Sequence, residues 1–234
     1  MTKPVARDAI YRHRRFQAED IEQCVRWYIT YRLSYRDLVA MMAERGVRVS
    51  HTTILRWVMR YVPDFEKRWA RYERPAQSSC RMDETAVSVR GGRFYLYRAV
   101  DKRGKTVNSL LCADVFATEE FFRQAVARQR SWPSKINLDG NAATHRALLF
   151  LRRQDPRWQS VVIRSRRYLN NIVEQDHRAI KRRCASMLGL KSYRSASITL
   201  AGVELAHRIR KQQFSIADGS QQSSLKHLWE QALA

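Results

Sequence analysis

Residues 81–101 read RMDETAVSVRGGRFYLYRAVD, and the pattern of this stretch decides the fold class. Polar and apolar residues alternate along 81–89, which predicts a strand with one buried face. Gly91 and Gly92 are typical of a tight turn, and the apolar, aromatic run 93–101 predicts a second, antiparallel strand. The stretch TVNSLLCADV (106–115) predicts a third strand beside them.

Helices and strands alternate in the sequence that follows. The periodicities predict helices and strands as follows: a helix over 118–129, a strand over 134–139, a helix over 143–153, a strand over 160–163, a helix from about Asn170, and a helix over 195–213. Three antiparallel strands followed by this alternation predict a mixed five-stranded sheet flanked by helices, in the α+β or α/β class.

An all-helical unit precedes the hairpin. Residues 20–60 carry three apolar stripes at helical spacing. The second helix has Ser34 as its N-cap and Gly46 as its stop, and the third begins after Ser50 and ends before Pro63. A helix, a glycine-containing turn and a helix form the helix-turn-helix arrangement, although a plain helical hairpin packed on another part of the chain has the same pattern.

In a helix-turn-helix motif the second helix enters the major groove of DNA with its first residues against the bases. We therefore expect DNA contacts from the following residues of 51–60: His51, Thr52, Thr53, Arg56 and Arg60.

These patterns divide the chain into four parts. We expect a helix-turn-helix DNA-binding domain in 1–62, a linker in 63–79, a domain with the mixed sheet in 80–215 and a weakly ordered tail in 216–234, the tail with a short terminal helix.

The overall charge indicates the kind of partner. The chain has 44 Lys and Arg residues against 22 Asp and Glu, a net charge of +22, which favours a polyanion such as nucleic acid. The four cysteines form no CxxC pair, so neither a disulfide framework nor a zinc module is indicated. No apolar run is long enough for a membrane span, which excludes a membrane partner and favours the cytoplasm.

Three acidic residues stand out in this basic chain: Asp83 in the first strand, Asp139 at the end of the fourth, and Glu174 on the helix after the fifth. Three carboxylates at one sheet edge repel each other unless a cation lies between them. Hard divalent metals prefer such oxygen ligands, and a pair of them can promote displacement at phosphorus.

The helix that carries Glu174 also carries basic residues on the same side. His177, Arg178 and Lys181 follow Glu174 at helical spacing, so we expect them to contact DNA near the acids. Asp176 points about 200° away from Glu174, and we expect it to be a solvated charge or a charge of the N-terminal turn.

Five stretches together resemble the transposases of bacterial insertion sequences of the IS-six type. These stretches are MDET (82–85), YLYRAVDKRGKTV (95–107), NLDG (137–140), RYLNNIVEQDHRAIKRR (167–183) and MLGLKSYRSASITLAGVEL (187–205). The family has a DDE triad with 34 residues between its second Asp and its Glu, as between Asp139 and Glu174, and a basic residue seven positions after the Glu, as Lys181.

The resemblance implies a ribonuclease-H-like catalytic domain of the integrase kind. It implies that Asp83, Asp139 and Glu174 are the catalytic residues and hold two Mg²⁺ ions, with Mn²⁺ as a possible substitute. It also implies binding of the element's terminal inverted repeats, cleavage by water, transfer of the freed 3′-hydroxyl to target DNA, and replicative cointegrate formation. By the same analogy the protein acts on the bacterial nucleoid as a homodimer or higher multimer.

Other functions fit part of the pattern. A transcription regulator has the same helix-turn-helix but needs no metal, and a nuclease of the same fold class cleaves without joining strands. An inactive copy would only bind DNA. The sequence does not determine the repeat sequence, the target preference, the host or the number of subunits.

Overall fold

The computed structural model describes residues 9–11, 15–112, 118–138, 141–165, 170–184, 190–216 and 225–233. Its helices are α1 (Ala18–Thr30), α2 (Tyr35–Glu44), α3 (His51–Trp69), α4 (Thr118–Gln129), α5 (Ala142–Gln154), α6 (Asn171–Cys184), α7 (Tyr193–Arg210) and α8 (Leu225–Leu233). Short 3₁₀ helices span Ala9–Tyr11, Ala70–Tyr72 and Pro156–Ser160. No helix in these ranges is both long and apolar enough to cross a membrane.

One five-stranded sheet forms the centre of the part of the chain that follows α3. Its strands are β1 (Ser79–Val89), β2 (Gly92–Asp101), β3 (Thr106–Cys112), β4 (Lys135–Leu138) and β5 (Val162–Ser165). The order is β3-β2-β1-β4-β5, with β1 antiparallel to β2, β2 antiparallel to β3, and β4 parallel to both β1 and β5. This mixed sheet confirms the expected ribonuclease-H-like fold class.

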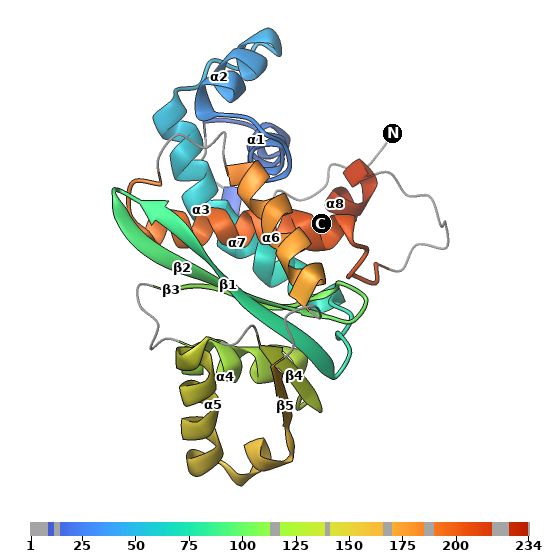
Figure 1. Ribbon diagram of the computed structural model, residues 1–234. Coiled ribbons are helices and arrows are strands. Elements are labelled where there is room, and N and C mark those ends of the chain that lie inside the picture. Colours follow the sequence, from blue (N-terminus) through green and yellow to red (C-terminus); the bar gives the residue numbers. More distant parts are fainter. Residues whose placement is uncertain are drawn as a thin grey trace.

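Helices cover both faces of the sheet (Figure 1). Helices α4 and α5 pack on one face, where an apolar cluster includes Met82, Tyr97 and Phe121. On the other face α6 and α7 lie between the sheet and α1–α3, as Figure 1 shows, and one apolar cluster runs from α1 and α3 through α7 to α8. The central sheet and the N-terminal helices therefore meet through α6 and α7.

Helix α7 passes very close to the N-terminal helices at Gly202. A Cβ placed on Gly202 would lie 2.7 Å from a methyl carbon of Ile29 in α1 and 3.0 Å from one of Val62 in α3. Carbon atoms in contact are normally about 3.5–4.0 Å apart, so only glycine fits at this crossing.

The start and stop signals of α2 act as the sequence predicts. Ser34 and Asp37 form a capping box, and Gly46, with φ of 78°, ends the helix in the left-handed region. Ser50 caps α3 by accepting a hydrogen bond from the Thr53 amide at 3.2 Å. The three helices and the turn between α2 and α3 thus form the expected helix-turn-helix.

The predicted end of α3 at Pro63 is wrong. Pro63 lies inside the helix, which continues to Trp69 through part of the segment expected to be a linker. An internal proline costs about 3 kcal/mol through its missing N–H. The continuation buries Phe65 and Trp69 fully, and both rings pack against Trp229 of α8, which offsets that loss.

Residues 225–233 of the tail form a helix. It is α8, at the place of the expected short terminal helix, and its Trp229 is 1% exposed. Trp229 completes the aromatic contacts around α3.

Candidate active site

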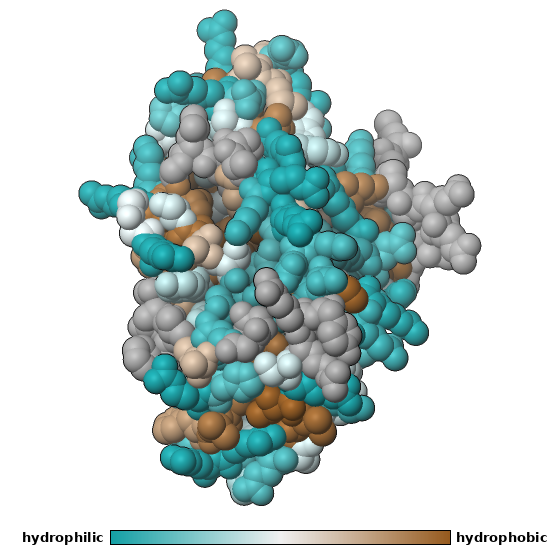
Figure 2. All heavy atoms as spheres, in the orientation of Figure 1, coloured by the Kyte–Doolittle hydropathy of each residue, from teal (hydrophilic) through white to brown (hydrophobic). Residues whose placement is uncertain are grey.

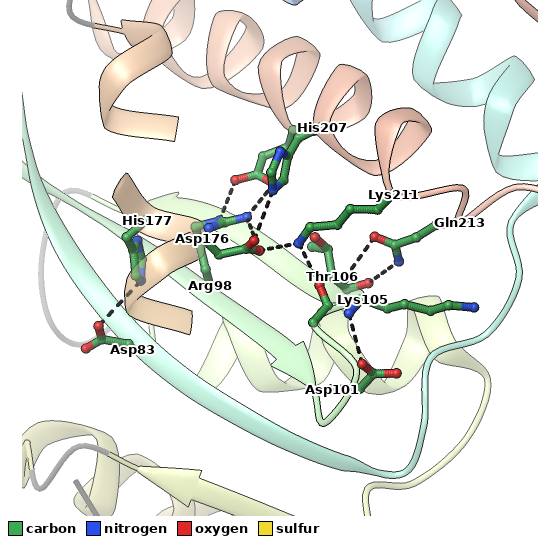
Figure 3. A network of polar contacts seen from close by, with 12 residues as sticks. Asp83, Arg98, Asp101, Lys105, Thr106, Asp176, His177, His207, Lys211 and Gln213 are labelled. Atoms are coloured by element: carbon green, nitrogen blue, oxygen red, sulfur yellow. Dashed lines mark hydrogen bonds and ion pairs between the residues drawn. The ribbon is translucent and has the colours of Figure 1, made fainter. Parts of the chain in front are cut away.

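The carboxylate of Asp83 is held from two sides. Its Oδ1 accepts a hydrogen bond from the Glu84 amide at 3.0 Å. Its Oδ2 lies 3.6 Å from Nε2 of His177, which α6 brings over β1 (Figure 3). The side chain of Asp83 is 17% exposed, so it is reachable from solvent but is oriented by the protein.

Two buried asparagines tie the neighbouring elements together next to Asp83. Asn170 immediately precedes α6 and donates to the carbonyl oxygen of Met82 on β1 at 3.3 Å. Asn137 on β4 donates to Asn170 Oδ1 at 2.7 Å. Both side chains are almost fully buried. This asparagine brace, Asn137 and Asn170, therefore fixes the start of α6 against β1 and β4.

Glu174 lies in the first turn of α6, half-buried, four residues after Asn170. Arg178 and Lys181 follow it one and two turns on, and both are exposed. Figure 2 shows hydrophilic side chains gathered where Figure 1 places α6. The helix thus presents a carboxylate and two exposed cationic side chains along one side, as the spacing predicts.

Asp139 lies outside the described residues. Strand β4 ends at Leu138, and the strand is parallel to β1 with Arg81 opposite Asn137. Within the described ranges no three His, Cys, Asp or Glu side chains are grouped so that they could hold a metal ion. The three-carboxylate site therefore stays a prediction.

Asp176 is not solvated, and the expectation for it is wrong. It is 9% exposed and points into the protein, where it meets Arg98 of β2 at 3.1 Å and His207 of α7 at 3.0 Å. Lys211 also forms an ion pair with it. The 200° separation from Glu174 is real, but it turns Asp176 towards the sheet and α7 instead of towards water.

A buried charge cluster results behind the site, comprising Arg98, Asp176, Glu204, His207 and Lys211 (Figure 3). Arg98 is its centre, fully buried, with Nε 2.5 Å from Glu204 Oε1. Removing this cation would leave Glu204 without its ion-pair partner in a low-dielectric interior and would take one of three partners from Asp176. The cluster therefore fixes α6 against β2 and α7.

The environment shifts the pKa values of Asp176 and His177 strongly. Burial on its own would raise the pKa of the Asp176 carboxyl, but His207, Arg98 and Lys211 outweigh it and hold that pKa well below its usual range. Burial lowers the pKa of His177 to about 3, and the charge of Arg98 acts in the same direction. His177 is therefore neutral at physiological pH.

His177 is also less accessible than expected for a DNA contact. It is 4% exposed and faces Asp83, because position 177 falls on the inward side of α6 with Val173 and Ile180. The buried ring leaves little surface for a phosphate.

The residues expected to read DNA lie at the start of α3. His51, Thr52, Arg56 and Arg60 are exposed. Thr53 is half-buried, and its hydroxyl lies 3.0 Å from that of Ser50. Four of the five side chains are thus free to meet a ligand on the outer side of this helix.

Arg98 and Glu204 were not among the residues predicted from the sequence to lie at the site. The signal was present, since Arg98 interrupts the apolar run of β2 and Glu204 interrupts the buried face of α7. A charged residue at an inward position of an apolar element is rarely found unless it is paired.

Comparison with known proteins supports the family resemblance that the sequence motifs indicate. Residues 77–213 match the protein family described as "DDE domain". The chain is 33% identical over 208 residues to the transposase for insertion sequence-like element IS431mec of Staphylococcus aureus, covering 86% of this chain and 88% of that one.

The transposase for insertion sequence element IS257 in transposon Tn4003, from the same species, matches with the same identity and coverage. Among solved structures, a chain of a simian T-cell lymphotropic virus intasome in complex with PP2A regulatory subunit B56 gamma is similar, with a TM-score of 0.39 and 14% identity, over 79% of this chain and 76% of that one. By the family match and the identity to its relatives, this chain belongs to the DDE transposases of IS-six-type insertion sequences, which are polynucleotidyl transferases acting on DNA.

Proposed function

We propose that this transposase binds the terminal inverted repeats of its own element, cleaves the DNA at the element's ends and joins the freed 3′-hydroxyl to target DNA. The observation that carries the proposal is the asparagine brace. Its two hydrogen bonds connect three places in the chain. These are Met82, just before Asp83; Asn137 on β4, the strand that Asp139 follows in the chain; and Asn170, just before the helix of Glu174. The elements that bear Asp83 and Glu174 are therefore tied to the strand that precedes Asp139 in the chain.

The side chains at this place suit divalent metal ions. Carboxylate oxygens are hard ligands of the kind that Mg²⁺ prefers, and Asp83 keeps a partly exposed carboxylate for such an ion. We propose that Asp83, Asp139 and Glu174 together hold two Mg²⁺ ions, which Mn²⁺ can replace. Bound in pairs, such ions activate the attacking oxygen and stabilise the leaving oxygen at phosphorus.

The protein's own residues position the DNA. Arg178 and Lys181 extend from the Glu174 side of α6 and are exposed, so their charges can meet the backbone phosphates next to the bond that is broken. Both chemical steps are in-line displacements at phosphorus, so one site serves water first and the 3′-hydroxyl second. No covalent protein–DNA intermediate is required, and cointegrate formation is the proposed outcome.

We assign end recognition to the exposed residues at the start of α3. His51 and Thr52 lie at its first turn, where a recognition helix meets base edges, and Arg56 and Arg60 follow on later turns. Thr53 shares its hydroxyl with the Ser50 cap and so also fixes the start of the helix. Two ends must be joined in one event, so a homodimer or larger assembly working on DNA at the nucleoid in the cytoplasm belongs to the same proposal.

A strand-transfer assay tests the proposal. Purified protein is incubated with pre-cut element ends, a target plasmid and Mg²⁺, and joined products are counted. We expect Asp83→Asn, Asp139→Asn and Glu174→Gln each to reduce joining at least about 1,000-fold, which corresponds to about 4 kcal/mol of activation free energy. Binding of the ends should remain, because these substitutions change none of the α3 residues to which end recognition is assigned.

The control is Glu120→Gln, which removes an exposed acid from α4 on the opposite face of the sheet. Joining at the wild-type rate by any of the three acid variants would remove that residue from the site. Cleavage of uncut ends without joining would indicate a nuclease, and end binding without either reaction would indicate an inactive copy.

A further inference from the structure

The ring of His177 is buried beside Asp83, whose backbone is a weak hydrogen-bond acceptor for it. It is 4% exposed, and among the described residues neither ring nitrogen makes a hydrogen bond of normal geometry. Leaving a buried polar group unsatisfied costs about 1–3 kcal/mol, so such a group in a packed interior calls for an explanation. The nearest acidic group is Asp83 Oδ2, 3.6 Å from Nε2.

Ion pairs as well as apolar packing hold α6 in place around His177. One residue earlier, Asp176 is anchored to Arg98, His207 and Lys211. On the next turn Ile180 is buried in the apolar cluster. These contacts hold α6 at one rotation, so the ring of His177 can only face β1, at the point where Asp83 lies opposite Arg98 of β2.

The two carboxylate oxygens of Asp83 have different neighbours. Oδ1 already accepts a hydrogen bond from the Glu84 amide, which fixes one side of the carboxylate. Oδ2 faces the imidazole. A donor on Oδ2 would fix the rotation of the carboxylate completely and so set the direction in which its remaining lone pairs point.

We propose that His177 is a positioning residue for Asp83, whose Nε2–H donates to Oδ2 and aims the carboxylate at a divalent metal ion. The inference rests on the proposed function, because it assumes that Asp83 is a metal ligand. Carboxylates that bind metals are commonly held by hydrogen bonds from residues behind them, and loss of such a bond typically costs about 10–100-fold in metal affinity or activity. Hydrogen bonds in catalytic sites are often long before the ligands arrive and shorten in the complex.

Direct measurement of Mn²⁺ binding tests the inference without relying on catalysis. The full chain is titrated with Mn²⁺ and the free ion is followed by electron paramagnetic resonance. The variants are His177→Gln, whose amide reaches the position of Nε2, and His177→Asn, whose amide reaches only the position of Nδ1. Both keep a polar group and differ mainly in where the donor lies.

We expect His177→Asn to raise the Mn²⁺ Kd about 10–100-fold, as loss of a supporting hydrogen bond typically does, and His177→Gln to restore a value close to wild type. In strand transfer, His177→Asn should require more Mn²⁺ for half-maximal rate and approach the wild-type rate at saturating Mn²⁺. An unchanged Kd in His177→Asn, or equal losses in the Asn and Gln variants, would overturn the inference.

Two further variants separate the possible causes. Ile180→Ala creates a cavity on the next turn of the same helix, away from Asp83, and should lower stability without changing the Mn²⁺ Kd. If it raises the Kd as much as His177→Asn does, loosening of α6 explains the effect and the inference fails. Asp83→Asn reports on the proposed function itself: if the wild type binds Mn²⁺ no better than this variant, the metal site fails independently of His177.

Discussion

The two faces of the central sheet both bury apolar side chains, but the face under α6 and α7 also buries a group of charges. Tyr97 and Ala99 on β2 point towards α4 and α5 and join an apolar cluster with Phe121 and Leu148. Arg98 lies between them on the same strand, is just as fully buried, and points the other way into the charge cluster under α6 and α7.

The difference shows that burial serves two purposes in this fold. Burying apolar area stabilises the folded state by about 25 cal/mol per Å². Burying ions costs desolvation energy that their mutual attraction at best roughly repays. The α4–α5 face therefore supplies stability, whereas the charge cluster mainly holds α6, with Glu174 and His177, in one orientation.

The largest effect should follow from breaking the charge cluster. Arg98→Met leaves Asp176 and Glu204 without their shared cation and should lower the free energy of unfolding by about 3–5 kcal/mol. Urea unfolding followed by circular dichroism measures this loss.

The matching control replaces all three charges at once. The triple variant Arg98→Met, Asp176→Leu and Glu204→Met removes these three charges together but leaves the half-buried Lys211 without its carboxylate, so it should recover only part of the lost stability. Its strand transfer should stay low, because α6 is no longer held by the ion pairs. A triple variant with normal activity would contradict the positioning role of the cluster.

On the apolar face, a cavity should reduce stability alone. Leu148→Ala on α5 removes a side chain that is 1% exposed and should cost about 2–5 kcal/mol in unfolding free energy. Below its unfolding temperature this variant should keep the Mn²⁺ affinity of the wild type. A weaker affinity would show that the two faces are not separate in function.

The smallest effect at neutral pH should come from His177→Gln, and it should grow as the pH falls. The pKa of His177 is lowered to about 3 in the folded protein, from an ordinary value of 6.5. Below pH 6.5 the unfolded chain takes up a proton that the folded chain refuses, so the wild type loses stability as the pH falls, by up to about 1.4 kcal/mol per pH unit.

The Gln variant lacks this titration. The unfolding free energy of the wild type relative to the variant should therefore decrease from pH 6.5 to pH 4, a window above the range in which Asp176 titrates. Urea unfolding at half-unit pH steps measures it. Parallel pH curves for the two proteins would show that His177 is not held neutral by the fold.

Much of the fold could be predicted because its signals are local. The alternation in 81–89, the paired glycines and the capping residues Ser34 and Ser50 each act within a few residues. The continuation of α3 through Pro63 could not be predicted, since the helix is maintained by Trp229, which is remote in sequence.

The same distinction applies to the site. Helical spacing alone places Arg178 and Lys181 beside Glu174. The burial of Asp176 depends on partners 78 residues earlier, at Arg98, and 35 residues later, at Lys211, and no local rule connects them. The sequence showed that Asp176 faces away from Glu174 but not what it faces.

The close crossing at Gly202 has a consequence for any attempt to exchange modules between related elements. Because α7 touches α1 and α3 there with no room for a methyl group, the unit proposed to recognise the repeats packs tightly against the unit proposed to cut them. In the proposed function, the distance between the recognised bases and the cleaved phosphodiester is then fixed by the protein. Grafting foreign N-terminal helices onto this chain should fail unless the donor brings the matching surface of α7 with them.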